Sequence, residues 1–168
     1  MSNSAKPDKP AKTQPRVARA PVALADCGMA RAIDMVGDRW VLLVLRELFY
    51  GVRRFDDLEA DTGAPRAVLS QRLRSLVSNG LADRIPYKEE GSRTRYEYVL
   101  TPKGRDLGVV VAALTEWGDR HLRSDPAPVE FIDAAGGAAL HLAFVAKSGK
   151  IVPNARVGVR VKAKTKKP

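Results

Sequence analysis

The fold of this chain is decided by residues 69–101, which read LSQRLRSLVSNGLADRIPYKEEGSRTRYEYVLT. The leucines of this stretch recur at three- and four-residue steps, which predicts an amphipathic helix that ends near Gly80. Residues 81–87 and 95–100 have the composition of strands, and a polar loop with two arginines joins them. The sequence therefore predicts one helix followed directly by a β-hairpin.

Three further helices are expected before this stretch. Residues 26–36 carry apolar side chains at helical spacing, and residues 38–50 contain the dense apolar run VLLVL of a buried helix. Phe55, Leu58 and a turn at Asp61-Thr62-Gly63 predict a helix of about two turns, and Pro65 suits the first turn of the leucine-bearing helix. Two short helices with a tight glycine turn between them make a helix-turn-helix.

A long helix is expected over residues 102–122, because Thr101 and Pro102 form a typical helix start. Its apolar stripe recurs at three- and four-residue steps and consists of Leu107, Val110, Val111, Leu114, Trp117 and His121. A regular stripe at the end of a domain that already has a core predicts packing against a partner subunit. We read these six residues as the dimerisation surface of a homodimer.

The expected fold class is mainly α with a small β wing, followed by a short C-terminal β-rich extension. Val157, Val159 and Val161 alternate in that extension, and a turn is expected at residues 147–150. By composition the chain divides into a disordered basic N-terminal tail (1–24), a winged-helix and dimerisation domain (25–122), a linker (123–128), a small β appendage (129–161) and a basic C-terminal tail (162–168).

The formal net charge of +10 on 168 residues is concentrated in the two ends of the chain. Residues 1–24 hold five basic side chains and one acidic one, residues 153–168 hold six basic side chains and no acid, and the middle is neutral. Basic tails raise the affinity for any DNA and its salt dependence, but they read no sequence. Any specificity must therefore come from the neutral middle.

Several classes of protein are excluded by what the sequence lacks. It has no apolar run long enough to cross a bilayer and no secretion-signal pattern, so a cytoplasmic location is expected. Cys27 is the single cysteine, which excludes an intrachain disulfide and a multi-thiolate metal site. No phosphate-binding glycine loop or paired-carboxylate motif is present, so we expect neither an enzyme nor a cofactor or metal.

The chain also resembles a known family from about Cys27 to His121. The residues that carry the resemblance are Cys27, Gly37-Asp38-Arg39-Trp40, Arg46-Glu47-Leu48, Gly51-Val52-Arg53-Arg54-Phe55, LSQRLRSLVSNGL at 69–81, Tyr96 to Thr101, Lys103-Gly104 and Glu116-Trp117-Gly118. They resemble the HxlR-type winged helix-turn-helix transcriptional regulators of bacteria and archaea, relatives of the MarR group. The resemblance implies a homodimer that binds a palindromic operator and usually represses until an effector or a stress acts.

The candidate DNA-binding residues lie on the predicted helix-turn-helix and wing. They are Arg54, Pro65, Arg66, Ser70, Gln71, Arg74, Arg93 and Arg95. The outward face of the leucine helix offers donors and acceptors for a major groove, and the wing arginines suit phosphates or a minor groove. The alternatives are an ordinary solvated helix face and a mixed-charge hairpin that serves solubility. Arg72 could contact DNA or pair with an acid such as Asp57 or Glu59.

Cys27 is the candidate effector site, since the resemblance implies that some family members sense oxidants through a cysteine at this position. Cys27 lies near a predicted helix start and the basic Arg31, surroundings in which reactive thiols occur. The alternative is a small buried hydrophobe. Trp40 and Trp117 are read as core and dimer packing rather than ligand contacts.

The predicted function is that of a sequence-specific, DNA-binding transcriptional regulator, a homodimeric repressor released by a small-molecule or redox effector. The alternative is a non-specific architectural protein that coats DNA with its basic tails. A regulator prefers its operator by about a thousandfold or more, whereas a coating protein shows almost no preference.

Overall fold

A computed structural model describes residues 22–91 and 93–160. Most of the expected N-terminal tail, the C-terminal tail at 162–168 and Val161 lie outside the described residues. The chain divides into two units, one of which spans Gly28–Leu142. The described residues of the other unit are 22–27 and 143–160.

The helices of the larger unit up to the wing begin and end within two residues of the predicted positions. They are α1 (Gly28–Val36), α2 (Arg39–Tyr50), α3 (Phe55–Thr62) and α4 (Arg66–Ser78). The Asp38 carboxylate caps α2 by accepting hydrogen bonds from the amides of Trp40 and Val41 at 2.9 and 3.2 Å. Gly51 ends α2 with a φ of +90°, a conformation that strains any residue with a side chain.

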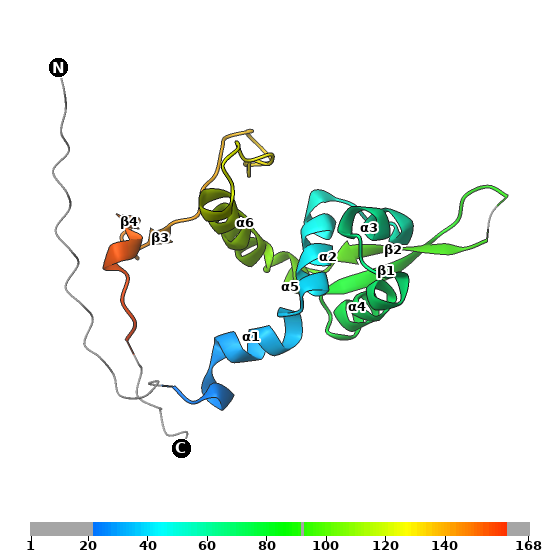
Figure 1. The fold of residues 1–168 in the computed structure, drawn as a ribbon, viewed down its shortest axis with the longest axis horizontal. Helices are drawn as coiled ribbons and strands as arrows, with labels where there is room; N and C mark the ends of the chain where they lie inside the picture. The colour runs from blue at the N-terminus through cyan, green and yellow to red at the C-terminus, as the bar shows by residue number, and fades with distance from the viewer. Residues whose placement is uncertain (1–21, 92, 161–168) are drawn as a thin grey trace. The chain divides into compact units, whose positions relative to one another are not determined.

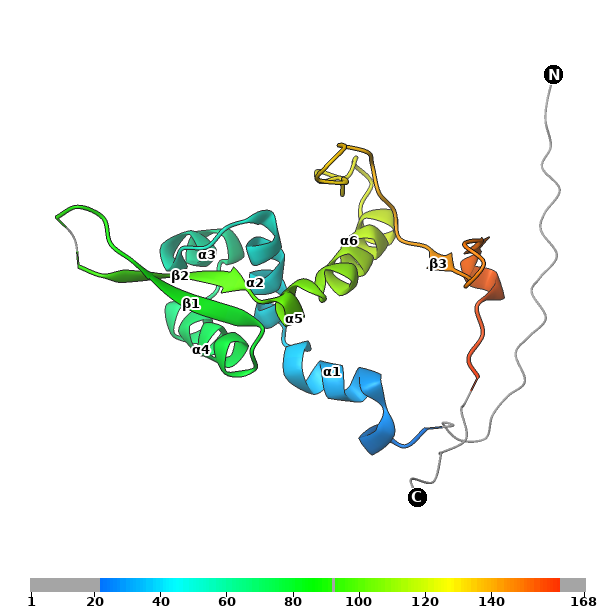
Figure 2. The ribbon, with the colours of Figure 1, turned by 180° about the vertical axis from the view of Figure 1, so that it is seen from behind.

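The wing is an antiparallel hairpin of β1 (Ala82–Tyr87) and β2 (Arg95–Leu100), in which Ala82 lies opposite Leu100. The segment before α3 pairs with the hairpin, because Arg54 forms a β-bridge with Glu97. Figures 1 and 2 show the hairpin extending outward past α3 and α4. The predicted helix followed directly by a hairpin is confirmed.

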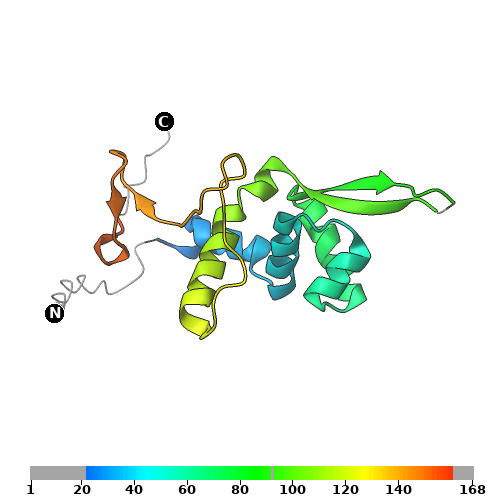
Figure 3. The ribbon, with the colours of Figure 1, turned by 90° about the horizontal axis from the view of Figure 1, so that it is seen from above.

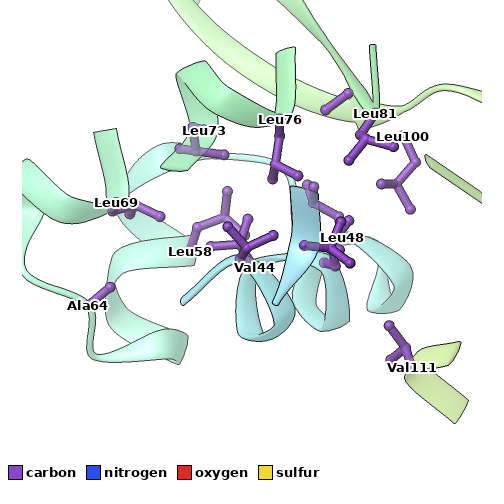
Figure 4. Packing of buried hydrophobic residues seen from close by; sticks show 14 residues of the cluster. Val44, Leu48, Leu58, Ala64, Leu69, Leu73, Leu76, Leu81, Leu100 and Val111 are labelled. Atoms are coloured by element: carbon purple, nitrogen blue, oxygen red, sulfur yellow. The ribbon is translucent and has the colours of Figure 1, made fainter. Parts of the chain in front are cut away.

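Leucines from α2, α3 and α4 form the centre of the core, as Figure 4 shows. The side chains of Leu45, Leu58, Leu69 and Leu73 have no exposed surface, and Leu76 is 1% exposed. Full burial of one leucine stabilises the fold by about 1.5–3 kcal/mol. The leucine stripe predicted for α4 is therefore what holds this helix on the domain.

The single helix predicted over residues 102–122 is wrong, because the structure breaks it into α5 (Pro102–Arg105) and α6 (Gly108–Leu122). Two glycines contact different partners on either side of the break. A Cβ on Gly104 would lie 2.0 Å from the carbonyl oxygen of Leu81, and one on Gly108 would lie 3.0 Å from the Phe49 ring. The close approach of Gly104 to Leu81 and that of Gly108 to Phe49 thus lie on either side of the break.

Residues 123–142 belong to the larger unit and contain no helix or strand. Ile132 forms an isolated β-bridge with Ala139, and the amide of Leu142 donates to Glu116 Oε1 on α6 at 2.9 Å.

In the other unit, β3 (Phe144–Val145) and β4 (Ile151–Val152) pair around the turn predicted at residues 147–150. The strand suggested by the alternating valines is absent from the described residues 157–160. Pro153 has no amide hydrogen for a ladder, and it opens a 3-10 turn at Asn154–Arg156 instead.

Candidate nucleic-acid interface

The outer face of α4 is polar and accessible to solvent. Arg66, Gln71 and Arg74 are exposed, and Ser70 is half-buried. They lie opposite the buried leucines, because side chains three and four residues apart share one face of a helix. Figure 3 shows α4 and the β1–β2 hairpin in the same part of the larger unit. The predicted orientation of this helix is confirmed, and Pro65 is the residue directly before it.

Arg66 is held by two acids of the preceding helix, which the sequence did not indicate. Its Nη1 and Nη2 atoms each lie 3.3 Å from Asp56 Oδ1, and Nη1 lies 2.5 Å from Glu59 Oε2. Its guanidinium carbon lies 4.6 Å from the centre of the Phe55 ring. The arginine side chain remains 65% exposed, so a ligand can still reach it.

Arg72 points to a different partner from the acids expected for it. Its Nε and Nη2 atoms donate to the two carboxylate oxygens of Asp38, each at 2.9 Å. Burial alone raises the pKa of Asp38, but the Arg72 hydrogen bonds and the capped amides outweigh burial and lower it. Arg72 therefore ties α4 to the start of α2, and neither Asp57 nor Glu59 is its partner.

The remaining candidate arginines, one before α3 and two in the wing, differ in their partners. Arg54 Nη2 lies 2.9 Å from Glu89 Oε1, and its guanidinium carbon lies 4.9 Å from the Tyr87 ring centre. Arg95 Nη1 lies 3.9 Å from Asp56 Oδ2, at the limit of an ion pair. Arg93 is exposed and, within the described part of the chain, forms no hydrogen bond or ion pair. Its charge is thus uncompensated beside the wing tip.

The apolar stripe of α6 divides between two environments. Val111 is 7% exposed and lies in the core of its own chain, and half-buried Leu107 packs against that core. These two residues of the predicted dimer surface therefore also pack within their own chain. Val110, Leu114 and Trp117 are 44%, 51% and 55% exposed.

The two tryptophans, Trp117 of α6 and Trp40 of α2, lie in different environments. Exposed His121 lies beside Trp117, with ring centres 5.3 Å apart. Half-buried Trp40 packs against the core, as predicted.

A hollow of about 270 Å³ lies between α2 and α6, lined by Leu42, Leu43, Arg46, Val111, Leu114 and Thr115. Arg46 Nε donates to Glu47 Oε1 at 2.7 Å, and Glu47 is a buried carboxylate at 4% exposure. The lining of the hollow is mainly apolar, and the Arg46 guanidinium at its edge is paired with the Glu47 carboxylate.

Cys27 is half-buried and directly precedes α1. Within residues 22–91 and 93–160, no three His, Cys, Asp or Glu side chains lie close enough to hold a metal ion. Among the same residues, no helix is long and apolar enough to span a membrane.

Comparison with known proteins agrees with this architecture. The model of the HxlR-like helix-turn-helix family matches residues 35–126. The uncharacterized HTH-type transcriptional regulator Rv3095 of Mycobacterium tuberculosis is 49% identical over 100 residues, which are 60% of this chain and 62% of that protein. The chain thus spans less than two thirds of that relative. The uncharacterized HTH-type regulator sll1512 of Synechocystis is 33% identical over 111 residues, 66% of this chain and 81% of that one.

Solved structures give the same result. The crystal structure of PA1607, a candidate transcription factor, superposes with a TM-score of 0.70 at 30% identity and covers 82% of this chain and 96% of its own. The redox regulator HypR in its reduced form superposes with a TM-score of 0.51 at 25% identity, over 57% of this chain and 96% of its own. The fold is thus a winged helix-turn-helix, and the chain belongs to the HxlR-like helix-turn-helix family.

Proposed function

We propose that this chain is a sequence-specific transcriptional regulator that places α4 in the major groove of duplex DNA and the β1–β2 wing on the backbone. The observation that carries the proposal is the division of α4 into two faces. Its leucines are buried in the core, while Arg66, Gln71 and Arg74 are exposed to solvent on the other face. Guanidinium and amide groups are the side chains that read guanine and adenine edges in that groove.

A homodimer is the assembly we propose, with a palindromic operator as its target. The exposed apolar surface of α6 at Val110, Leu114 and Trp117 supports it, and α1 adds Met29 and Ile33 at 73% and 53% exposure. A cluster of large exposed apolar side chains on one helix face, such as that of α6, marks an interaction site. Two copies related by a twofold axis present two α4 helices to half-sites one helical turn apart, about 34–36 Å.

Repression relieved by an effector is the mode of regulation we propose. A ligand in the α2–α6 hollow touches both the helix next to α4 and the helix of the proposed dimer, so it can bias their relative position. Oxidation of Cys27 is the second route, favoured by the likeness to a protein named a redox regulator. Because the sequence has one cysteine, the disulfide joins the Cys27 thiols of the two subunits, and the added oxidant takes up their two electrons and two protons. Adding diamide to the operator complex tests it: affinity should fall for the wild type and stay constant for Cys27→Ser. Equal behaviour of both proteins eliminates the redox route.

Selection of duplexes from a random pool by the purified protein tests the proposed function. We expect a palindrome bound about a thousandfold more tightly than random DNA. Recovery of unrelated sequences would instead support the architectural alternative, in which the basic tails coat DNA in the cytoplasm. Deletion of residues 1–24 and 162–168 should weaken the salt dependence and leave the footprint in place.

A further inference from the structure

The hydrogen bonds of Arg66 occupy one side of its guanidinium and leave the other side free. Asp56 and Glu59 together engage both hydrogens of Nη1 and one hydrogen of Nη2. Within the described residues, Nε and the remaining Nη2 hydrogen have no acceptor. These two N–H groups form a fork that matches a pair of adjacent acceptors.

The same acids decide which acceptor fits that fork. With the carboxylates of Asp56 and Glu59 beside it, the positive charge of Arg66 is balanced, and Asp56 is shared with Arg95. A phosphate oxygen approaching this group is repelled by the two carboxylates. The O6 and N7 atoms of guanine accept hydrogen bonds without carrying a net charge, so the carboxylates do not exclude them.

The position of the guanidinium is also fixed on more than one side. The Phe55 ring lies 4.6 Å from its central carbon, and Arg66, Phe55, Ala67 and Ser70 line an open hollow of about 560 Å³. Asp56 further reaches Arg95 of the wing at 3.9 Å. A fork held in place before DNA arrives loses less conformational freedom on binding than a free side chain.

The geometry points to Arg66 as the residue that reads a guanine in each half-site, with Asp56 and Glu59 as the positioning residues that aim it and keep phosphate away. This inference rests on the proposed function. It separates Arg66 from Arg93, which has no acid partner among the described residues and is suited to a phosphate. It also gives the acids of α3 a role in specificity rather than in folding alone.

The test uses the full chain, the duplex recovered by selection with the wild type and a random duplex of equal length. Arg66→Lys keeps the charge but removes the fork, so operator affinity should fall about tenfold to hundredfold while random binding stays nearly constant. The double variant Asp56→Asn/Glu59→Gln should bind random DNA about fivefold to tenfold more tightly, because two negative charges leave the surface. Its preference for guanine at one base pair should fall about tenfold.

Asp57→Asn is the matched control, because it removes one charge from the same helix turn without touching Arg66. Replacement of the guanine by 7-deazaguanine removes the N7 acceptor. This replacement should lower the operator affinity of the wild type far more than that of the Arg66→Lys variant.

The outcomes separate the two proposals. A wild type that selects no preferred duplex overturns both the proposed function and this inference. A wild type with a clear operator, together with an Arg66→Lys variant that loses operator and random affinity equally, overturns the inference alone. A double variant whose base preference is unchanged, or no different from that of Asp57→Asn, also overturns it.

Discussion

Helices α4 and α6 both carry an apolar stripe, yet the two stripes end in different environments. Leu69 and Leu73 of α4 have no exposed surface, whereas Leu114 and Trp117 of α6 are 51% and 55% exposed. One chain completes the packing of α4 by itself and leaves only its polar face open. The same chain completes only the side of α6 that carries Val111.

The two helices therefore suit different binding partners. A helix whose apolar face is already buried offers its polar face to a polar ligand, which supports DNA for α4. A helix that leaves large apolar side chains in water offers them to another apolar surface, which supports a second copy for α6.

Paired leucine substitutions should show the largest energetic difference between the two helices. Leu73→Ala should lower the free energy of unfolding by about 2–5 kcal/mol, because it opens a cavity in the packed core. Leu114→Ala should lower it by less than about 1 kcal/mol at a protein concentration low enough to dissociate subunits. Urea denaturation of both variants measures the difference, and equal losses would contradict the contrast.

A charge placed on α6 should separate the subunits. Trp117→Asp buries a carboxylate in the proposed dimer surface, so the molar mass by analytical ultracentrifugation should fall to that of one chain. Affinity for the two-half-site duplex should fall about a hundredfold, since each chain then binds alone. Arg120→Ser is the control on the same helix, and a dimer that survives Trp117→Asp refutes the assigned surface.

The ion pair that joins α4 to α2 should have a smaller effect, because both side chains are partly exposed. Asp38→Asn keeps the cap on α2 but loses the charge opposite Arg72, which should cost about 1 kcal/mol at pH 7. The folded-state pKa of Asp38 is lowered, so its contribution is present above the unfolded value near 3.8 and is lost as pH falls through the folded value. The stability gap between wild type and Asp38→Asn should therefore close below about pH 4. A difference in free energy of unfolding that grows as the pH falls would contradict the lowered pKa of Asp38.

Removal of Arg93, which has no ion pair among the described residues, should have the smallest effect. Arg93→Ala should lower the affinity for operator DNA and for random DNA to the same degree. It should also lower the slope of log affinity against log salt concentration by about 1. Affinities measured at several salt concentrations on both duplexes check it. A loss restricted to the operator would make Arg93 a base reader instead.

The elements of this domain could be predicted from the sequence because their signals are local. The leucine spacing of α4, the glycine after α2 and the strand-like segments of the wing each act within a few residues. The break between α5 and α6 could not be predicted in the same way. It is flanked by the contacts of Gly104 with Leu81 and of Gly108 with Phe49, which join residues distant in sequence.

The charged contacts of the candidate site depend on tertiary structure as well. Arg72 lies 34 residues from Asp38, and nothing in the sequence between them singles out that acid over Asp57 or Glu59. The acids that hold Arg66 are close in sequence, but they meet it only because the turn at Gly63 folds α3 against α4. The candidate DNA-binding face was thus predictable, and the partners of its arginines were not.

A cross-linking experiment with two labelled positions tests the contrast between α4 and α6 most directly. In the Cys27→Ser background, a photoactivatable label is placed on Gln71→Cys of α4 or on Leu114→Cys of α6, with the selected operator present. The label at position 71 should attach to bases in the two half-sites, and the label at position 114 should attach to the second protein chain. Attachment of the α6 label to DNA, or an α4 label that attaches only to protein, would contradict the assignment of the two helices.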